Sequence, residues 1–270
     1  MELEYFGRSF YPYFYVVSIF LIFNYLNIKN DIIKVFLILF IILITYEPYL
    51  FAGYQEYLIF STLVIASRFI LLINFKDMNN DKIVYLTLSI LYLNCWFKDE
   101  GIIYFLIFNF SLIVLLNKSY KDKFILFFLV FVLLVLQFFL QKYLIGIHGF
   151  PHNSLLQILP SLLDIKILLT KISKIILHLL IAFIKHPAWI LIIISLITHI
   201  FFIRKIDIKF KFFISCLILN LGFISVLFFS FNNFDFMLRI TLDRLLFQTS
   251  GFYLVLILMT INNLKIFKNQ

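Results

Sequence analysis

Long runs of apolar residues, separated by short charged breaks, follow one another along nearly the whole chain. A helix that crosses a bilayer needs about 20 apolar residues, and most of these runs approach that length. The pattern therefore predicts an all-α bundle of transmembrane helices. The apolar runs are 10–28, 32–46, 56–75, 83–97, 101–117, 122–141, 172–184, 187–203, 210–230 and 243–262.

The stretch 83–117 shows how charges divide this pattern. As a single helix it would be about 52 Å long, whereas the hydrocarbon core of a bilayer is about 30 Å thick. It has to break, and its polar break is Lys98, Asp99 and Glu100, followed by Gly101. Three charges at mid-membrane would cost on the order of 8–10 kcal/mol. We therefore expect this tetrapeptide at the membrane interface or in a polar cavity.

Composition places the chain in a membrane. Of its 270 residues, 63% are hydrophobic and 14% are charged, whereas soluble domains carry about 25% charged residues. We expect one integral membrane domain over 1–270, surrounded by lipid. The 23 basic against 14 acidic residues fit basic cytoplasmic loops, so no nucleic-acid partner is expected. The start carries Glu2 and Glu4 without a basic segment and does not resemble a secretory signal peptide.

Lysines recur in every second break. The breaks at 29–34, 76–82 and 118–123 are rich in lysine and are predicted to be cytoplasmic by the positive-inside rule. The alternate breaks at 47–56 and 98–100 then face outward. The Lys-Asp-Glu-Gly turn is thus predicted on the non-cytoplasmic side.

The run 172–184 is better explained by a helix in the outer interface than by a span. Lys171, Lys174 and His178 fall at i, i+3 and i+7, one polar stripe on a helix. If this run does not cross, the basic cluster 204–211 lies in the cytoplasm. The resulting prediction is about nine spans plus an amphipathic interfacial helix; a short tilted span is the alternative.

Two outward segments carry candidate chemistry. Gly101 allows a tight turn, and the helix after it presents a positive dipole end that favours an anion. Lys98 adds a mobile positive charge, and Asp99 or Glu100 would bind a hydroxyl, a metal or the lysine. An ordinary charged turn is the alternative.

The segment TLDRLLFQ raises a question about its arginine. Asp243 suits a helix N-terminus, but Arg244 stands at the wrong end of the helix dipole. We expect an anion beside Arg244, either Asp243, Asp235 or a ligand phosphate gripped bidentately. A snorkelling interfacial arginine paired with Asp243 is the alternative.

Other polar residues carry weaker signals. Glu47, which precedes the helix-ending Pro48, and Glu56 are acid or base candidates or ordinary loop charges. His148 and His152 flank Gly-Phe-Pro and do not form a helical metal pair. No metal site is predicted. The two cysteines lie in apolar runs and form no zinc or disulfide pattern; they are Cys95 and Cys216.

Three motifs in order resemble bacterial GT-C type membrane glycosyltransferases, the superfamily of protein mannosyltransferases and aminoarabinose transferases. FKDEG resembles their Lys-Asn/Asp-Glu-Gly turn, and ITLDRLLFQTSG resembles their TSxDRLLxQ element at the start of the last helix. GYQEYLIF is similar to their GYxDLxL segment, with Glu56 where aspartate is usual. The resemblance covers about 47–250.

The resemblance implies an enzyme of the bacterial inner membrane that takes a sugar from a polyprenyl-phosphate carrier. The sugar would pass to a lipid, glycan or protein hydroxyl outside the cytoplasm. Lys98 and Arg244 would hold the carrier phosphate, and Glu56 and Glu100 would be the catalytic carboxylates. A need for a divalent cation is left open. Supporting residues would be Asp99, Gly101, Asp243, Asp235 and Gln248.

Two features depart from that family. Its catalytic aspartate lies in the first outward loop, and nothing before Glu47 matches that loop; its histidine before TSxDR corresponds here to Met237. The chain is therefore expected to be a C-terminal portion, one part of a split enzyme with a second membrane subunit, or a silent relative. A non-catalytic subunit, a flippase for lipid-linked sugars and an O-antigen-type polymerase stay open; Arg68 is the main charge inside a run.

Overall fold

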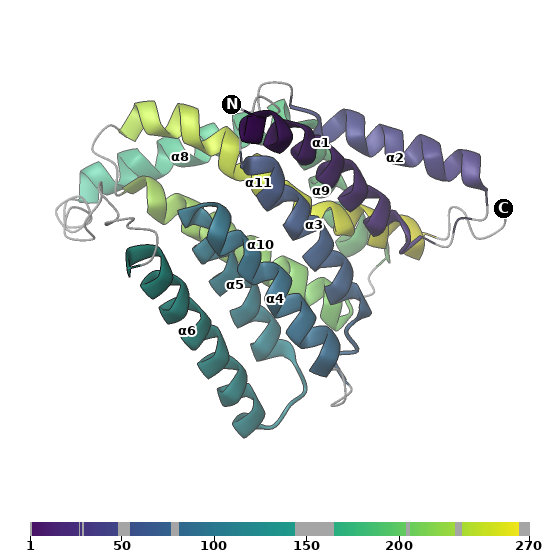
Figure 1. Ribbon diagram of the computed structural model, residues 1–270. Coiled ribbons are helices and arrows are strands. Elements are labelled where there is room, and N and C mark those ends of the chain that lie inside the picture. Colours follow the sequence, from purple (N-terminus) through teal and green to yellow (C-terminus); the bar gives the residue numbers. More distant parts are fainter. Residues whose placement is uncertain are drawn as a thin grey trace.

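The computed structural model describes residues 2–26, 28, 30–47, 55–76, 81–143, 165–203, 206–229 and 234–264. Within these ranges every regular element is a helix, as the apolar pattern predicts (Figure 1). The helices are α1 Glu2–Phe23, α2 Asp31–Thr45, α3 Glu56–Leu72, α4 Asp81–Phe97, α5 Asp99–Leu115, α6 Tyr120–Tyr143, α8 Ile165–Lys185, α9 Pro187–Thr198, the π-helical turn η3 His199–Ile203, α10 Ile208–Phe229 and α11 Phe234–Asn263.

Polar residues set the helix boundaries. The chain breaks between α4 and α5 at Lys98, whose backbone is extended (φ −157°, ψ 160°), as its run of charges predicts. Asn30 caps α2, because its side chain accepts hydrogen bonds from the N–H groups of Ile32 and Ile33. Asp207 accepts the N–H of Phe210 at 2.7 Å in the first turn of α10.

Fewer helices than expected are long enough to cross a membrane. Three described helices meet the criteria of length and apolarity, and a fourth span is counted if α8 and α9, bent by 99°, form one broken span. About nine were predicted. α2 has 15 residues and α3, α4 and α5 have 17 each, or about 22–26 Å at 1.5 Å per residue, which is less than the hydrocarbon core. The three helices that pass are Tyr120–Gln141, Ile208–Phe228 and Thr241–Asn263.

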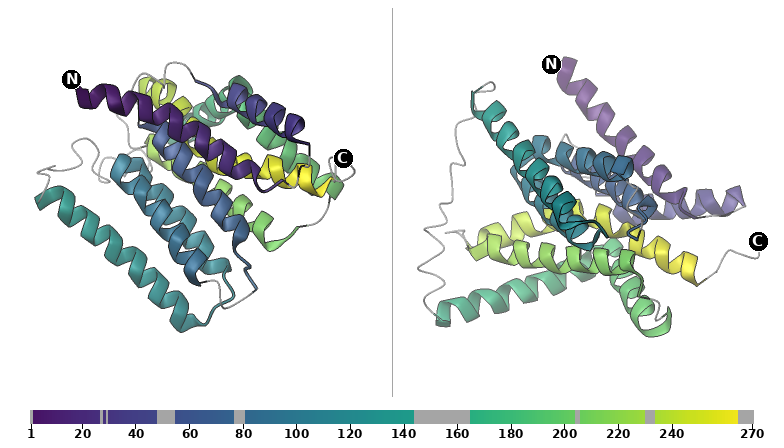
Figure 2. Two further views of the ribbon diagram at one scale, coloured as in Figure 1. Left: turned by 45° about the vertical axis from the view of Figure 1, so that its right-hand side comes forward. Right: turned by 90° about the horizontal axis from the view of Figure 1, so that it is seen from below.

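The core lies between α3 and α11, which pack closely against each other at the centre of the bundle (Figure 1). The apolar window of α11 is 89% buried, whereas that of α6 is 17% buried. α6 lies at the edge, packed against α5 and α4 (Figure 2). Its outer face exposes aromatic side chains such as Phe124, Phe128 and Phe131. Such a face is costly in water and ordinary in lipid, which supports a membrane environment.

Two glycines mark places where helices approach closely. A Cβ on Gly251 of α11 would lie 2.6 Å from the carbonyl oxygen of Phe60 in α3. A Cβ on Gly101 would lie 1.9 Å from the carbonyl oxygen of Asn94 in α4. The expectation that Gly101 forms the tight turn is wrong. The turn is at Lys98, and Gly101, already inside α5, is required because the two helices meet there.

Contacts between the helix ends show which breaks in the apolar pattern lie together. At one end the hydroxyl of Tyr57 in α3 holds the backbone of Glu47 after α2, and Glu56 meets Lys98. At the other end the N–H of Asn117 bonds to the carbonyl of Phe75. Glu47 and Glu56 therefore share one end of the bundle with Lys98, as the alternation predicts. Which end faces the cytoplasm stays a prediction.

α8 has the amphipathic character expected of an interfacial helix. It spans Ile165–Lys185 and is longer than the predicted 172–184. Two of its lysines pair with α11: the Nζ of Lys174 lies 2.9 Å from Asp235 Oδ1, and that of Lys185 lies 2.5 Å from Asp243 Oδ2. Another face is an exposed apolar stripe suited to contact with lipid tails; it consists of Leu169, Ile172, Ile176, Leu180 and Ile184.

Candidate functional site

Three residues from distant segments meet at one carboxylate oxygen. Glu56 is the first residue of α3, Lys98 separates α4 from α5, and Arg244 lies in α11. The Nζ of Lys98 lies 2.5 Å from Glu56 Oε1. The Nε and Nη2 atoms of Arg244 both lie 2.8 Å from the same oxygen. Each of the three motifs singled out in the sequence thus contributes one residue to a single cluster.

The cluster combines a buried anion with two partly exposed cations. The side chain of Glu56 is fully buried, while those of Lys98 and Arg244 are 19% and 31% exposed. A buried carboxylate without partners is costly, so Glu56 depends on both cations. Its Oε2 is buried and forms no hydrogen bond to any described group. Two cations around one carboxylate leave a net charge of +1 within the cluster.

The two cations retain donors for a ligand. Lysine has three N–H donors and arginine has five. After the contacts with Glu56, two donors on Lys98 and three on Arg244 have no other hydrogen bond in the described part of the chain. α3 and α5 also begin at this point, and helix N-termini carry a partial positive charge. The arrangement suits an anion with several oxygens, such as a phosphate.

The position of Arg244 differs from the expectation. α11 begins at Phe234, well before Asp243 and Arg244, so neither residue lies at the start of the last helix. The argument from the helix dipole is therefore wrong for both. An anion does lie beside Arg244, but it is Glu56 rather than Asp243 or Asp235. Sequence reasoning does not find this partner because it lies 188 residues away in the chain.

Gln248 lies close to the cluster in the chain and bonds to α5. It follows Arg244 by one helical turn and is fully buried. The hydroxyl of Tyr104, one turn after Glu100 in α5, donates to Gln248 Oε1 at 3.0 Å. This bond joins α5 to α11 one helical turn away from Glu100 and Arg244.

Asp243 belongs to a second cluster that the sequence analysis missed. Its Oδ2 lies 2.5 Å from Lys185 Nζ, and its Oδ1 lies 3.5 Å from His186 Nε2. The other ring nitrogen of His186, Nδ1, lies 3.0 Å from Glu47 Oε1. The signal in the sequence was the polar Lys-His-Pro break between two apolar runs. A histidine placed there is an exception to the apolar pattern.

His186 lies at the corner between α8 and α9, outside both helices, and its side chain is 7% exposed. Burial disfavours the charged ring, but the carboxylates of Asp243 and Glu47 outweigh burial and raise the pKa of His186 to about 9. His186 is therefore an imidazolium at neutral pH.

The remaining predicted residues lie apart from the Glu56 cluster. Asp235 pairs with Lys174 on α8. Asp99 is exposed and Glu100 is half-buried, and within the described ranges no ion pair joins either of them to Lys98 or Arg244. Across those ranges no group of three histidine, cysteine or carboxylate side chains is arranged so that it could hold a metal ion. The helix-ending Pro48 and the two histidines that flank Gly-Phe-Pro, His148 and His152, lie outside the described residues.

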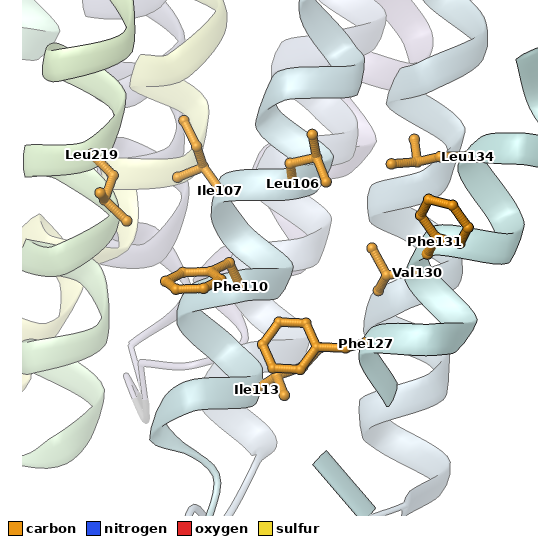
Figure 3. A pocket seen from close by; sticks show the side chains of 9 residues that line it. All are labelled: Leu106, Ile107, Phe110, Ile113, Phe127, Val130, Phe131, Leu134 and Leu219. Carbon is orange, nitrogen blue, oxygen red and sulfur yellow. The ribbon is translucent and has the colours of Figure 1, made fainter. Parts of the chain in front are cut away.

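A separate apolar groove runs along α5, between α6 and α10 (Figure 3). Its volume is about 430 Å³, within the range of ligand pockets. It shares no residue with the charged cluster, but α5 connects the two. Leu106, at the near end of the groove, is about 12 Å along the helix axis from Lys98. The groove is lined by Leu106, Ile107, Phe110, Ile113, Phe127, Val130, Phe131, Leu134 and Leu219.

No protein-family model matches the chain, and no curated protein or solved structure matches it.

Proposed function

We propose that this chain is a membrane glycosyltransferase, or the donor-binding part of one, that uses a polyprenyl-phosphate-linked sugar. Transfer would take place on the non-cytoplasmic side, to a lipid, glycan or protein hydroxyl. The observation that carries the proposal is the convergence of Lys98, Arg244 and Glu56 on one oxygen with cationic donors left over. The resemblance of the same three motifs to GT-C type enzymes supports it.

The cluster suits the chemistry of a phosphate leaving group. When an acceptor hydroxyl attacks the anomeric carbon, the bond from that carbon to the carrier phosphate breaks and the phosphate oxygen keeps the electron pair. Lys98 and Arg244 would stabilise this developing charge. Arg244 would supply planar paired donors and Lys98 a compact charge. The acceptor proton would have to pass to a base.

The two predicted catalytic carboxylates take different roles in this proposal. Glu56 is buried beneath both cations, which use its Oε1, so it orients Lys98 and Arg244. Glu100 is half-buried in the first turn of α5 and is the carboxylate we assign to the acceptor proton. A base from a second membrane subunit is the alternative, in which case this chain would bind the donor and its partner would complete the site.

The apolar groove would take part of the isoprenoid chain of the same donor. A phosphate held at Lys98 directs its chain down the bundle, and the groove on α5 extends from about 12 Å to about 22 Å below that residue. Three phenyl rings, Phe110, Phe127 and Phe131, contribute to its lining.

The charges of the described helices favour this proposal over a flippase. A transport pathway would place charges inside the spans. Arg68 instead lies near the end of α3, and Lys209 near the start of α10 donates to the carbonyl of Leu71.

The test is binding and transfer with the full chain in lipid nanodiscs. Lys98→Gln and Arg244→Gln are each expected to weaken decaprenyl-phosphate binding by about tenfold or more, because each removes a charge-assisted hydrogen bond to the phosphate. Transfer from a decaprenyl-phosphate sugar to a membrane extract should fall with them. Lys174→Gln removes a lysine from an ion pair on α8 and should leave both unchanged. Wild-type affinity and transfer in both cluster variants would refute the proposal, and binding without transfer by the pure wild-type chain would favour the partner-subunit form.

A further inference from the structure

The corner between α8 and α9 carries a buried histidine held by carboxylates from two other elements. The two helices are bent by 99° relative to each other, and His186 fills the bend just before Pro187. Its Nδ1 contacts Glu47 at 3.0 Å and its Nε2 approaches Asp243 at 3.5 Å. Both contacts join segments far apart in the chain.

The charges around the ring come from three of the elements next to it. The segment after α2 provides Glu47, α11 provides Asp243, and the end of α8 provides Lys185, which also pairs with Asp243. α9, from Pro187 to Thr198, has no charged residue. A neutral imidazole would donate one hydrogen bond to Glu47, whereas the protonated ring also attracts Asp243 through its charge across 3.5 Å, a contact in which Nε2 forms no hydrogen bond.

Both carboxylates are connected to the Glu56 cluster, one through the chain and the other through a hydrogen bond. Asp243 directly precedes Arg244 in α11. Glu47 is held by the residue after Glu56, because the hydroxyl of Tyr57 accepts from Glu47 N at 3.0 Å and donates to Glu47 O at 3.1 Å. His186 therefore ties together the backbone segments that carry Glu56 and Arg244.

We infer that protonated His186 is a positioning residue that bridges Glu47 to Asp243, holds Glu56 and Arg244 in register, and makes anion binding at the cluster dependent on pH. The binding part of this inference rests on the proposed function, whereas the structural part does not. Burial lowers the pKa of His186 and its two carboxylates raise it, to about 9 overall. Since this folded-state value exceeds the usual value of 6.5, the stabilisation is fully present below pH 6.5 and is lost as pH rises through about 9.

The experiment compares the wild-type chain with H186Q, which is neutral at every pH, and H186K, which stays charged over most of the range. Thermal unfolding and decaprenyl-phosphate binding are measured in nanodiscs from pH 6 to pH 10. Between pH 6 and pH 10 the affinity of the wild type for decaprenyl phosphate should fall about tenfold more than that of H186Q. H186Q should bind weakly with little dependence on pH, and H186K should keep its affinity to a higher pH than the wild type. Effects of pH that do not involve position 186 are common to all three proteins and cancel in the ratios.

The outcomes separate the two proposals. If no variant binds decaprenyl phosphate but wild-type stability still falls near pH 9 and that of H186Q does not, the proposed function fails and the bridge stands. Identical pH profiles in all three proteins overturn the bridge. If H186Q does not fold, the ¹⁵N signal of the His186 ring, assigned by its absence in H186K, decides the matter. A ring that titrates near pH 6.5 overturns the inference.

Discussion

The guanidinium of Arg244 lies 2.8 Å from the Oε1 of Glu56, although 188 residues separate them in the chain. This contact joins the two central helices, α3 and α11, at the end of the bundle where the Lys-Asp-Glu-Gly turn also lies. It explains how two charged residues are accommodated at the end of an apolar bundle. Glu56 is neutralised in a buried position, and Arg244 is held in one orientation with donors to spare.

Replacing the buried carboxylate tests this relationship. Glu56→Gln leaves Lys98 and Arg244 facing each other without an anion, so it should destabilise the fold by about 3 kcal/mol. A bound phosphate would restore the missing negative charge. We therefore expect decaprenyl phosphate to raise the melting temperature of the variant more than that of the wild type. An equal shift in the two proteins would contradict the assignment of Lys98 and Arg244 to phosphate binding.

The close approach of α3 and α11 gives a prediction with an internal control. Gly251→Ala should cost about 1–3 kcal/mol, because its Cβ would lie 2.6 Å from the carbonyl oxygen of Phe60. Gly222→Ala in α10 meets nothing within 4 Å and should be neutral or stabilising by up to about 1 kcal/mol. Thermal unfolding of both variants in the same detergent checks this. Equal effects would show that the packing of α3 on α11 is not as described.

The groove on α5 predicts a dependence on chain length. Leu106→Trp should fill the near end of the groove and weaken binding of decaprenyl phosphate. Binding of geranyl phosphate should be unaffected, because its two isoprene units are too short to reach Leu106, about 12 Å along the helix from Lys98. Phe36→Trp on α2 is the control, since Phe36 is exposed and lies outside the groove. Equal losses for both ligands would show that the isoprenoid chain binds outside this groove. They would leave the assignment of Lys98 and Arg244 to the phosphate unchanged.

The ion pair between Lys174 and Asp235 should contribute little to stability. Both side chains are exposed, so solvent and salt screen the pair. A hydrogen bond from Lys174 lowers the pKa of Asp235. The small stabilisation that the ion pair contributes is therefore present above the usual pKa of Asp235, and it is lost as the pH falls through the lowered pKa. Lys174→Ala should leave the melting temperature unchanged at neutral pH, and a clear decrease would show that α8 depends on this pair.

The helices could be predicted closely because the forces that define them are local. The charges at Lys98 stop α4 and start α5 within one residue, as the length of the 83–117 stretch required. The number of spans could not be predicted in the same way, because several apolar runs form helices of only 15–17 residues, which are shorter than the hydrocarbon core. The start of α11 was also missed: an apolar run was expected from 243, yet the helix begins at Phe234.

The sequence by itself determined which residues are polar exceptions in an apolar chain, because each charge in such a setting is costly and requires a reason. Lys98 was identified on that ground, whereas Arg244 was identified by its expected position in a helix and Glu56 by its place in the GYQEYLIF motif. Only the tertiary structure decided that these three share one oxygen and that His186 joins Glu47 to Asp243. A charge is paired by whichever group the fold brings within a few ångströms, and distance along the chain carries no information about that choice.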